Sequence, residues 1–211
     1  GIERIRLGSL DPDMLTPESI TRLAAVDKLC PQYHLSLQSG CSATLRRMRR
    51  VYTAEQYAQV VADIRAAYGD RPVSFTTDCI CGFPGETEAD FRESCDFLKQ
   101  IGFLKVHVFP YSRRKGTPAA SMPDQIEKAE KERRAAVAGE TAAALHRAYL
   151  ARQLGTEHDV LFEQTEKGYF TGHTMNYVKV YCDAENLRNE IRRVRITALF
   201  EDGVLAEPVS A

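Results

Sequence analysis

The chain has 211 residues, of which 44% are hydrophobic and 27% charged, a composition typical of globular proteins with a substantial core. Its 28 Lys and Arg residues face 29 Asp and Glu residues, so any binding to nucleic acid would depend on local basic patches rather than an overall positive field. No apolar run approaches the roughly 20 residues needed to cross a bilayer, and the first residues do not form a secretory leader. These features exclude disordered, collagen-like and membrane-spanning proteins.

Strands and helices are predicted to alternate in the first half of the chain. A threonine followed by a proline predicts a helix over residues 17–29. Capping boxes begin the next two helices at Thr53 and Thr87, and Gly102 ends the second of these. This alternation predicts parallel strands joined by right-handed crossovers. The extended segments cover residues 3–8, 33–38, 73–82 and 104–111.

Apolar and polar residues alternate within each predicted strand. Leu35 and Leu37 share one face, while His34 and Gln38 share the other. A strand buried on both faces would be almost continuously apolar, so the polar face predicts strands that line a cavity, as in an open or split βα barrel. Four strands cannot close a barrel. We therefore expect about the last four βα units of a longer barrel, of which this chain is a fragment.

The composition changes twice in the second half. Residues 125–154 are rich in Ala, Glu, Lys and Arg and predict a long helix, which Gly139 could interrupt and Gly155 ends. Short alternating segments then predict strands at residues 158–163, 169–171, 177–182 and 191–200. The sequence thus predicts a partial parallel βα barrel over residues 1–122, a helical connector over 123–155 and a small all-β barrel over 156–211.

Cysteine usage favours a reducing compartment. No pair of cysteines has the CxxC spacing that is common in zinc and iron–sulfur sites. We therefore expect free thiols that are buried in the core, and a cytoplasmic protein. The six residues are Cys30, Cys41, Cys79, Cys81, Cys95 and Cys182.

The carboxyl ends of the predicted strands are polar or rich in glycine, and functional residues of parallel βα folds lie there. Each end could serve the fold alone, as a turn or a helix cap, but their coincidence at one edge favours a binding site. The glycine turn lacks the endings of nucleotide-binding loops, so a different cofactor is expected to carry any reaction. The ends comprise Ser9, residues 38–40, residues 82–86 and residues 111–113.

Several segments together resemble the radical S-adenosylmethionine methylthiotransferases. They are HLSLQSG at residues 34–40, RRMRRVYT at 46–53, TTDCICGFPGETEADF at 76–91 and HVFPYSRRKGTPAA at 107–120. FTGHTMNYVKV at residues 170–180 resembles the small RNA-binding barrel called the TRAM domain, which closes these enzymes. The sequences of these motifs are most similar to those of the branch that methylthiolates N6-threonylcarbamoyladenosine beside the tRNA anticodon.

The resemblance implies a six-unit split barrel with S-adenosylmethionine and two four-iron four-sulfur clusters as cofactors. One cluster would cleave S-adenosylmethionine to a deoxyadenosyl radical that takes hydrogen from C2 of the adenine, and the second would supply sulfur. The family's CxxxCxxC loop does not occur in this sequence. We therefore expect no metal ligand and no catalytic residue in this chain, and no activity from the chain alone.

The resemblance also implies roles for residues near S-adenosylmethionine. Ribose hydroxyls would be held by Gln38 and Ser9, and the carboxylate by Arg50, while Glu86 would order the glycine turn. The adenine of the cofactor would lie against Ile80 and Gly82 at the end of the third predicted strand, and Tyr111 would contribute from the end of the fourth. The expected cofactor-binding set is Ser9, Gln38, Arg50, Ile80, Gly82 and Tyr111.

Contacts with tRNA are expected in three places. Arg113 and Arg114 stand at the fourth strand end, where a guanidinium could pair with the threonine carboxylate of the modified base, unless both belong to a solvated loop. The arginines of residues 46–50 are expected either to be solvated or to meet phosphate. In the small barrel, aromatic and basic residues share an outer face that also includes Tyr181, a pattern that suits RNA binding. The charge of this region does not favour RNA, since residues 151–211 carry 7 Lys and Arg against 10 Asp and Glu. The barrel residues expected to bind RNA are Tyr177, Lys179, Arg193 and Arg195.

Other functions stay open at this stage. Methylthiolation of isopentenyladenosine in tRNA, or of an aspartate in a ribosomal protein, would suit the same motifs. A noncatalytic RNA-binding protein on a degenerate barrel, or a phosphate-binding module that uses the glycine turn, would need no cluster. The expected partners are the anticodon stem-loop of tRNA and the missing N-terminal half of the barrel with its cluster domain.

Overall fold

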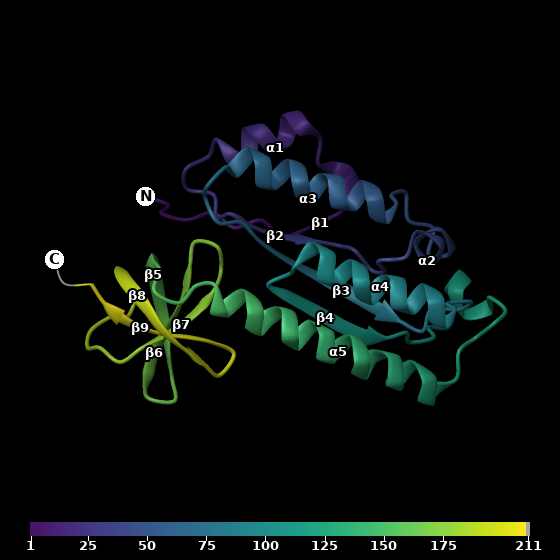
Figure 1. Cartoon of the computed structure of the whole chain (residues 1–211). Coiled ribbons are helices and arrows are strands. Elements are labelled where there is room, and N and C mark those ends of the chain that lie inside the picture. Colours follow the sequence, from purple (N-terminus) through teal and green to yellow (C-terminus); the bar gives the residue numbers. More distant parts are fainter. Residues whose placement is uncertain (210–211) are drawn as a thin grey trace.

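A computed structural model describes residues 1–209 and shows a four-stranded sheet and a closed five-stranded barrel, joined by one long helix (Figure 1). The sheet has the order β1-β2-β3-β4 and all its strands pair in parallel, which confirms the predicted α/β architecture. Within the described range, no helix is long and apolar enough to span a membrane. The elements of the first half are β1 (Ser9–Leu10), α1 (Pro17–Ala24), β2 (Gln32–Leu35), α2 (Ser42–Arg47), α3 (Ala54–Tyr68), β3 (Ser74–Cys81), α4 (Glu88–Ile101) and β4 (Lys105–Pro110), with short 3-10 turns η1 (Pro12–Met14) and η2 (Pro118–Ser121).

The first strand is shorter than predicted. Within residues 3–8, Ile5 bridges to Leu29, but β1 itself covers two later residues. Arg4 donates a 2.8 Å hydrogen bond to the backbone oxygen of His173 in the barrel. This segment therefore contacts the barrel instead of extending the sheet. The same bridge explains why α1 ends at Ala24, since the residues around Leu29 hydrogen-bond to Ile5 rather than continue the helix.

Capping boxes begin α1, α3 and α4. The side chains of Thr16, Thr53 and Thr87 each accept a hydrogen bond from the backbone N–H three residues later, whose own side chain bonds back to the threonine N–H. Gly102 ends α4 in the left-handed conformation, with φ 70°. The predicted starts of these helices and the predicted end of α4 are confirmed.

The connector is one unbroken helix, α5 (Lys128–Ala151), of 24 residues. Gly139 lies inside it without interrupting it. A single glycine costs a helix about 1 kcal/mol relative to alanine, and packing of α5 against β4 and α4 offsets this cost. The helix ends at Ala151, with Arg152 as its C-cap, and therefore stops before Gly155, which the sequence predicts as its end; Gly155, at φ 79°, lies in the turn that follows.

The barrel has five strands, one more than predicted. The additional strand is β9, which follows a two-residue turn at Glu201 and Asp202 and pairs with β8 as a hairpin. Gly172 is required in β6 because a Cβ there would overlap the backbone oxygen of Leu161. The last two residues of the predicted 156–211 barrel lie outside the described residues. The strands are β5 (Glu157–Glu166), β6 (Tyr169–Thr174), β7 (Lys179–Cys182), β8 (Glu190–Phe200) and β9 (Gly203–Pro208), in the closed order β5-β6-β7-β9-β8.

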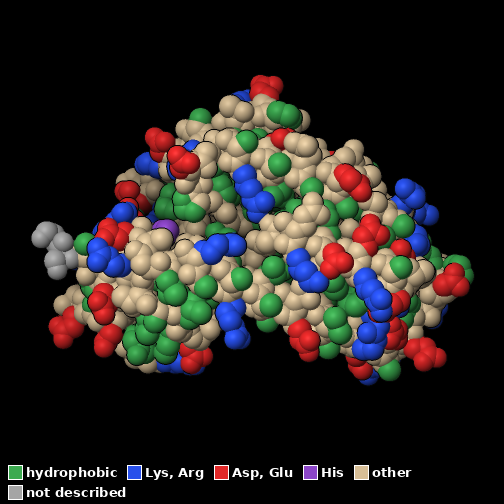
Figure 2. Space-filling model, viewed as in Figure 1, with side chains coloured by type: hydrophobic (Ala, Val, Ile, Leu, Met, Phe, Trp, Pro, Cys, Tyr) green, Lys and Arg blue, Asp and Glu red, His purple; other side chains and the backbone are tan. Residues whose placement is uncertain are grey.

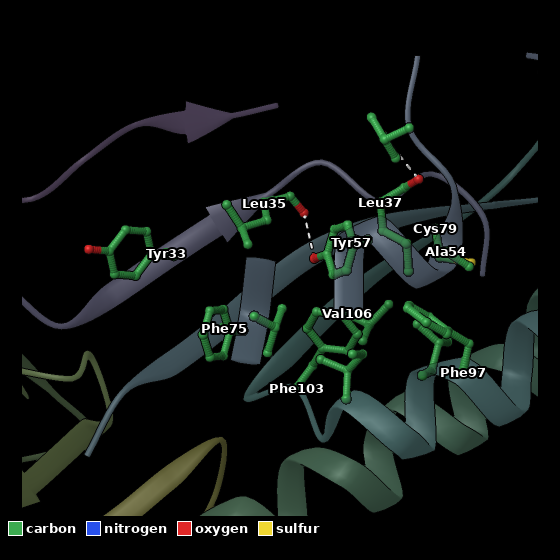
Figure 3. Packing of buried hydrophobic residues seen from close by; sticks show 14 of the residues in the cluster. Tyr33, Leu35, Leu37, Ala54, Tyr57, Phe75, Cys79, Phe97, Phe103 and Val106 are labelled. Atoms are coloured by element: carbon green, nitrogen blue, oxygen red, sulfur yellow. Dashed lines mark hydrogen bonds between the residues drawn. The ribbon is translucent and has the colours of Figure 1, made fainter. Parts of the chain in front are cut away.

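The main core fills the space between the sheet and the helices α1, α3 and α4 (Figure 3). Leu35 and Phe75 of the sheet are buried there, and the Tyr57 hydroxyl donates to the Leu35 oxygen at 3.1 Å. The opposite face of the same strands is partly exposed, for example at His34 and Asp78. The predicted alternation is confirmed, and so is the expectation that all six cysteines are free and buried.

The barrel docks against the amino ends of the sheet strands. Ser74, the first residue of β3, donates a 2.6 Å hydrogen bond to the Asn176 oxygen in the barrel. The His146 ring of α5 lies between the Leu104 oxygen, just before β4, and the Asp202 oxygen of the barrel, at 2.7 and 3.2 Å. The carboxyl ends of the strands therefore point away from the barrel (Figure 1).

Candidate functional site

A pocket of about 530 Å³ lies at the carboxyl ends of β3 and β4, on the polar face of the sheet. This size suits a small-molecule ligand. Its apolar lining includes Ile80, Phe109 and Pro110, and its polar lining includes Gln38 and Arg114. Three of the six predicted cofactor-binding residues line this pocket, namely Gln38, Ile80 and Tyr111.

The backbone holds Gln38 in the left-handed region, with φ 68°. Its N–H donates to the Asp78 oxygen at 2.9 Å, and its own oxygen accepts from the Ile80 N–H at 2.8 Å. This pairing to β3 fixes a conformation that is unfavourable for any residue other than glycine, and such residues cluster at functional sites. The bridge therefore directs the chain after β2 towards the pocket.

The Tyr111 hydroxyl is buried and has no hydrogen-bond partner within residues 1–209. Its ring packs edge-on against Phe83, with 5.2 Å between centroids, and the Lys131 ammonium lies 5.7 Å from its centroid. Buried hydroxyls are normally paired, because an unpaired one loses its hydrogen bonds to water. Tyr111 is also one of the residues that line the pocket.

The glycine turn after β3 is held by a buried ion pair. Glu86 Oε2 accepts from the Gly82 N–H at 2.7 Å and from Arg134 Nη1 of α5 at 2.9 Å. Burial raises the pKa of Glu86, and the Arg134 and Gly82 hydrogen bonds only partly oppose this effect. Glu86 thus orders the turn, as the sequence analysis expects, and it joins the turn to α5.

Three predicted cofactor residues are not among those lining the pocket. Ser9 is exposed at the beginning of β1. Arg50 pairs with Asp11 at 3.1 Å, beside η1. Gly82 faces α5, since a Cβ at this position would overlap the side chain of Lys131.

The two arginines predicted to meet the substrate point in different directions. Arg114 lines the pocket, whereas Arg113 donates through Nε to the Ala120 oxygen at 2.7 Å and lines a separate surface hollow. Both side chains are exposed. Of the two, Arg114 has the geometry to meet a ligand in the pocket.

The predicted RNA-binding residues of the barrel are engaged within the protein. The Arg6 guanidinium lies 3.7 Å from the Tyr177 ring centroid, and the His173 ring stacks on the Tyr177 ring with 4.2 Å between the centroids. Two groups this close must occupy opposite faces of the ring, so neither face is free for a base. Tyr181, expected on the outer face, is instead buried, and its hydroxyl donates to Asp202.

The basic residues of the barrel are paired with carboxylates. Lys179 lies 2.8 Å from Glu166 and 3.0 Å from Asp202. The pKa of Lys179 is raised overall, because partial burial, which would lower it, is outweighed by the hydrogen bonds to these carboxylates. Arg193 and Arg195 are exposed, as the alternation predicts, and both pair with Glu157, at 3.5 and 2.7 Å.

One titratable residue that lines the pocket, Asp78, is absent from the predicted site, as are two histidines on the neighbouring strands. Asp78 Oδ2 lies 3.7 Å from Nε2 of His34 on the neighbouring strand. His107, the partner of Asp78 in β4, has its pKa lowered by partial burial and by Lys105. The period-two pattern already placed these residues on the polar face, so it could have identified them.

A second group of possible ligand atoms lies outside the pocket. Cys41, Asp90 and Glu93 bring a thiol and two carboxylates within 4.8 Å of one another. Arg47 already neutralises Asp90 at 2.7 Å, and burial raises the pKa of the Cys41 thiol. Both effects disfavour a bound cation, since a metal binds the thiolate.

Comparison with known proteins identifies relatives over nearly the whole chain. Residues 2–98 match the family model of the Radical SAM superfamily. The threonylcarbamoyladenosine tRNA methylthiotransferase MtaB of Bacillus subtilis is 38% identical over 202 residues, which cover 93% of this chain and 44% of that protein. The tRNA-2-methylthio-N(6)-dimethylallyladenosine synthase of Symbiobacterium thermophilum is 37% identical over 201 residues, which cover 93% of this chain and 42% of that protein. The chain thus spans about half the length of the curated relatives it matches.

Among solved structures, coproporphyrinogen III oxidase (HemN) from Escherichia coli, a radical SAM enzyme, aligns with a TM-score of 0.51 over 90% of this chain and 44% of that chain. The two sequences are 13% identical, so this likeness concerns the fold alone. The sequence matches indicate a radical SAM protein. The parallel sheet, with a pocket at its carboxyl edge, is consistent with them. Over nearly its whole length, the chain is therefore similar to radical SAM methylthiotransferases.

Proposed function

We propose that this chain forms part of a radical SAM enzyme that methylthiolates an adenosine of tRNA, and that S-adenosylmethionine binds in the pocket at the carboxyl ends of β3 and β4. The observation that carries the proposal is the pocket of about 530 Å³ that Gln38, Ile80 and Tyr111 line, in a chain that is similar to tRNA methylthiotransferases. Ile80 and Phe109 offer an apolar surface for a purine.

Members of the superfamily use S-adenosylmethionine with an iron–sulfur cluster, and this pair supplies the radical chemistry when bound. The residues of this chain would bind and orient the cofactor. Gln38 would hold its ribose hydroxyls, and the Tyr111 hydroxyl would donate to one of its acceptor atoms. Glu86 and Arg134 would keep the turn after β3 in place, so that Ile80 stays against the purine. We also propose that the complete protein holds a second cluster, which would supply the sulfur.

The proposed substrate is N6-threonylcarbamoyladenosine next to the tRNA anticodon. Arg114 at the pocket supports this choice, because a guanidinium pairs well with the threonine carboxylate. The small barrel would then be the TRAM domain of the enzyme and residues 123–155 its connector. A tRNA substrate and six free thiols both favour the cytoplasm.

A second substrate is supported by a specific observation. A dimethylallyladenosine synthase matches the chain at 37% identity, close to the 38% of MtaB. Dimethylallyladenosine carries no carboxylate, so Arg114 would have no partner on that base. The two substrates therefore predict different effects of an Arg114 substitution.

The test uses the complete gene product, reconstituted with iron and sulfide without oxygen and supplied with S-adenosylmethionine. Three tRNA samples would be compared: threonylcarbamoylated, dimethylallylated and unmodified. Mass spectrometry of the digested nucleosides should show a methylthio product from the first sample alone. Arg114→Met should lower turnover on that tRNA without changing cofactor cleavage, whereas Arg22→Met, on the exposed side of α1, should change neither.

Other outcomes have clear meanings. A methylthio product from the dimethylallylated tRNA alone would show that dimethylallyladenosine is the substrate. Methylthiolation of a ribosomal protein would show that the substrate is a protein instead of tRNA. Binding of tRNA without cofactor cleavage would favour a noncatalytic RNA-binding protein. Undiminished turnover of Arg114→Met would remove this arginine from substrate recognition.

A further inference from the structure

A line of polar side chains crosses the polar face of the sheet, from the segment before β1 to the pocket. Arg6 Nε donates to Gln32 Oε1 at 2.8 Å, and Gln32 Nε2 donates to Thr76 Oγ1 at 3.1 Å. Thr76 Oγ1 lies 3.0 Å from His34 Nδ1, and His34 Nε2 lies 3.7 Å from Asp78 Oδ2. Asp78 in turn lines the pocket. We call Gln32, Thr76 and His34 the polar-face network.

The register of the strands brings the polar-face network together. Gln32 and His34 are two residues apart in β2, so their side chains point to the same face, and the same holds for Thr76 and Asp78 in β3. His34 pairs with Thr76 across the two parallel strands. Gln32 and Thr76 are both buried, so their polar atoms need partners inside the protein.

The direction of the first two hydrogen bonds follows from the chemistry of Arg6. A guanidinium has donors only, so the Gln32 oxygen must face Arg6 and the Gln32 amide nitrogen must face Thr76. The Arg6 guanidinium is itself held beside the barrel, 3.7 Å from the centroid of the Tyr177 ring. The Gln32 side chain is therefore fixed in one of its two amide orientations.

The orientation of Gln32 decides which nitrogen of the His34 ring carries the proton. Thr76 Oγ1 accepts from Gln32, and within residues 1–209 its only other partner is His34 Nδ1. If Nδ1 were protonated, the Thr76 hydroxyl proton would have no acceptor, which is unfavourable in a buried site. Thr76 therefore donates to Nδ1, and in the neutral ring the proton lies on Nε2.

The opposite end of the network favours the same tautomer. His34 Nε2 faces the Asp78 carboxylate at 3.7 Å, which is longer than a hydrogen bond but close enough for electrostatic attraction. An N–H at this position attracts the carboxylate, whereas a nitrogen lone pair would repel it. The His34 side chain is 16% exposed and the Asp78 side chain 35%. The histidine is thus the more buried of the two, and the carboxylate is accessible from the pocket.

We propose that His34 is a positioning residue for the pocket: the polar-face network keeps its proton on Nε2, and this N–H holds the Asp78 carboxylate as an acceptor for an N–H or O–H group of the bound ligand. The inference deepens the proposed function, since it takes the proposed cofactor as the ligand. S-adenosylmethionine offers such donors in its amino groups and ribose hydroxyls, and a carboxylate binds them through charge-assisted hydrogen bonds. His34 is not among the residues that line the pocket, so it acts through Asp78.

The first experiment determines the tautomer directly. The complete gene product would be produced with isotope-labelled histidine, and nitrogen–proton correlation spectra at a pH where the ring is neutral would distinguish the protonated from the unprotonated ring nitrogen. We expect His34 to carry its proton on Nε2. The signals that disappear in His34→Gln assign those of His34.

Gln32→Glu should move the proton to Nδ1. A carboxylate beside Arg6 stays ionised and can only accept from Thr76, whose hydroxyl must then accept from His34. Gln100→Glu, on the exposed side of α4, is the matched control and should leave the tautomer unchanged. The face drawn in Figure 2 already carries many acidic side chains, so one more at the surface is a small change.

The second experiment tests the effect on the pocket. Calorimetric titration of the reconstituted gene product with S-adenosylmethionine would compare His34→Gln, whose amide nitrogen can reach the position of Nε2, with His34→Asn, whose shorter side chain cannot. His34→Gln should keep most of the affinity, whereas His34→Asn should lose about 2- to 10-fold, the equivalent of one hydrogen bond. A purely structural role of His34 would instead weaken binding by both variants alike.

Three outcomes would contradict the proposal. They are a proton on Nδ1 in the unchanged protein, an unchanged tautomer in Gln32→Glu, and equal affinities of His34→Gln and His34→Asn for S-adenosylmethionine. Failure of the proposed function is distinguishable from these. If the unchanged protein does not bind S-adenosylmethionine, the proposed cofactor is rejected, and the two tautomer measurements alone decide whether the network fixes His34.

Discussion

At the scale of single residues, the pocket contains two local features that a compact fold would ordinarily avoid. The Tyr111 hydroxyl is buried without a partner, and Gln38 has φ 68°. Each is unfavourable in the chain without ligand, by about 1–3 kcal/mol for an unpaired buried group and a similar amount for the backbone. Both residues line the same pocket.

Tyr111→Phe tests the hydroxyl. We expect the variant to bind S-adenosylmethionine more weakly by about 1–3 kcal/mol, because the ligand loses a buried hydrogen bond. The unfolding free energy should stay equal or rise, since the hydroxyl has no partner within residues 1–209. Calorimetric titration and urea unfolding would measure the two quantities. Equal affinities for both proteins would place the cofactor elsewhere.

Gln38→Gly tests the backbone conformation separately from the side chain. Glycine adopts a positive φ without strain, so the unfolding free energy should not fall, while cofactor binding should weaken. Gln38→Ala keeps the strain and removes the same amide, so it serves as the comparison in both assays. A large loss of stability in the glycine variant would contradict the view that the left-handed conformation is strained for glutamine.

At the scale of elements, α5 is locked to the glycine turn by the Glu86–Arg134 pair. Arg134→Met should lower the unfolding free energy by about 3–5 kcal/mol, because it leaves the Glu86 carboxylate buried and unpaired. Arg133→Gln is the control, since its bonds to Glu88 and Glu130 are exposed and should leave the unfolding free energy almost unchanged. Urea unfolding at pH 7 would compare them.

The defect of Arg134→Met should also depend on pH. Burial already raises the pKa of Glu86, and removing Arg134 takes away a group that lowers it. A carboxyl with a raised pKa in the folded state is destabilising when ionised, so the loss should shrink as the pH falls through that pKa and grow as the pH rises. Unfolding measured from neutral to acidic pH would reveal this trend. A defect that stays constant over the range would contradict an ionised, unpaired Glu86.

At the scale of the whole molecule, Tyr177 joins the barrel to the segment before β1, because its ring lies between Arg6 of that segment and His173 of the barrel. Tyr177→Ala should weaken this docking by about 0.5–2 kcal/mol, the range for an arginine on an aromatic ring. Hydrogen exchange should then rise in residues 1–8 and in the β6–β7 turn before it rises in the sheet. Tyr169→Ala, which removes ring contacts inside the barrel, is the control and should leave residues 1–8 unchanged. Equal exchange in both variants would show that the stack does not hold the interface.

Local patterns were sufficient for much of the fold. Threonine caps and Gly102 specify where α3 and α4 begin or end, because the hydrogen bonds involved lie within a few residues. Alternation along the strands predicts the buried and the polar faces, since successive side chains point to opposite sides. The strand ends in turn predict the pocket residues Gln38 and Tyr111, whereas Ile80 follows only from the resemblance to the family.

Other features depend on partners that are distant in the chain, and no local pattern reveals them. The length of β1 depends on Arg4 binding His173, 169 residues later. Tyr177 and Lys179 have the residue types of an RNA surface, but Arg6 and Asp202 occupy them, so their availability follows from packing and ion pairing in three dimensions. The position of the barrel at the amino edge of the sheet is set in the same way, through contacts between residues that are far apart in the chain.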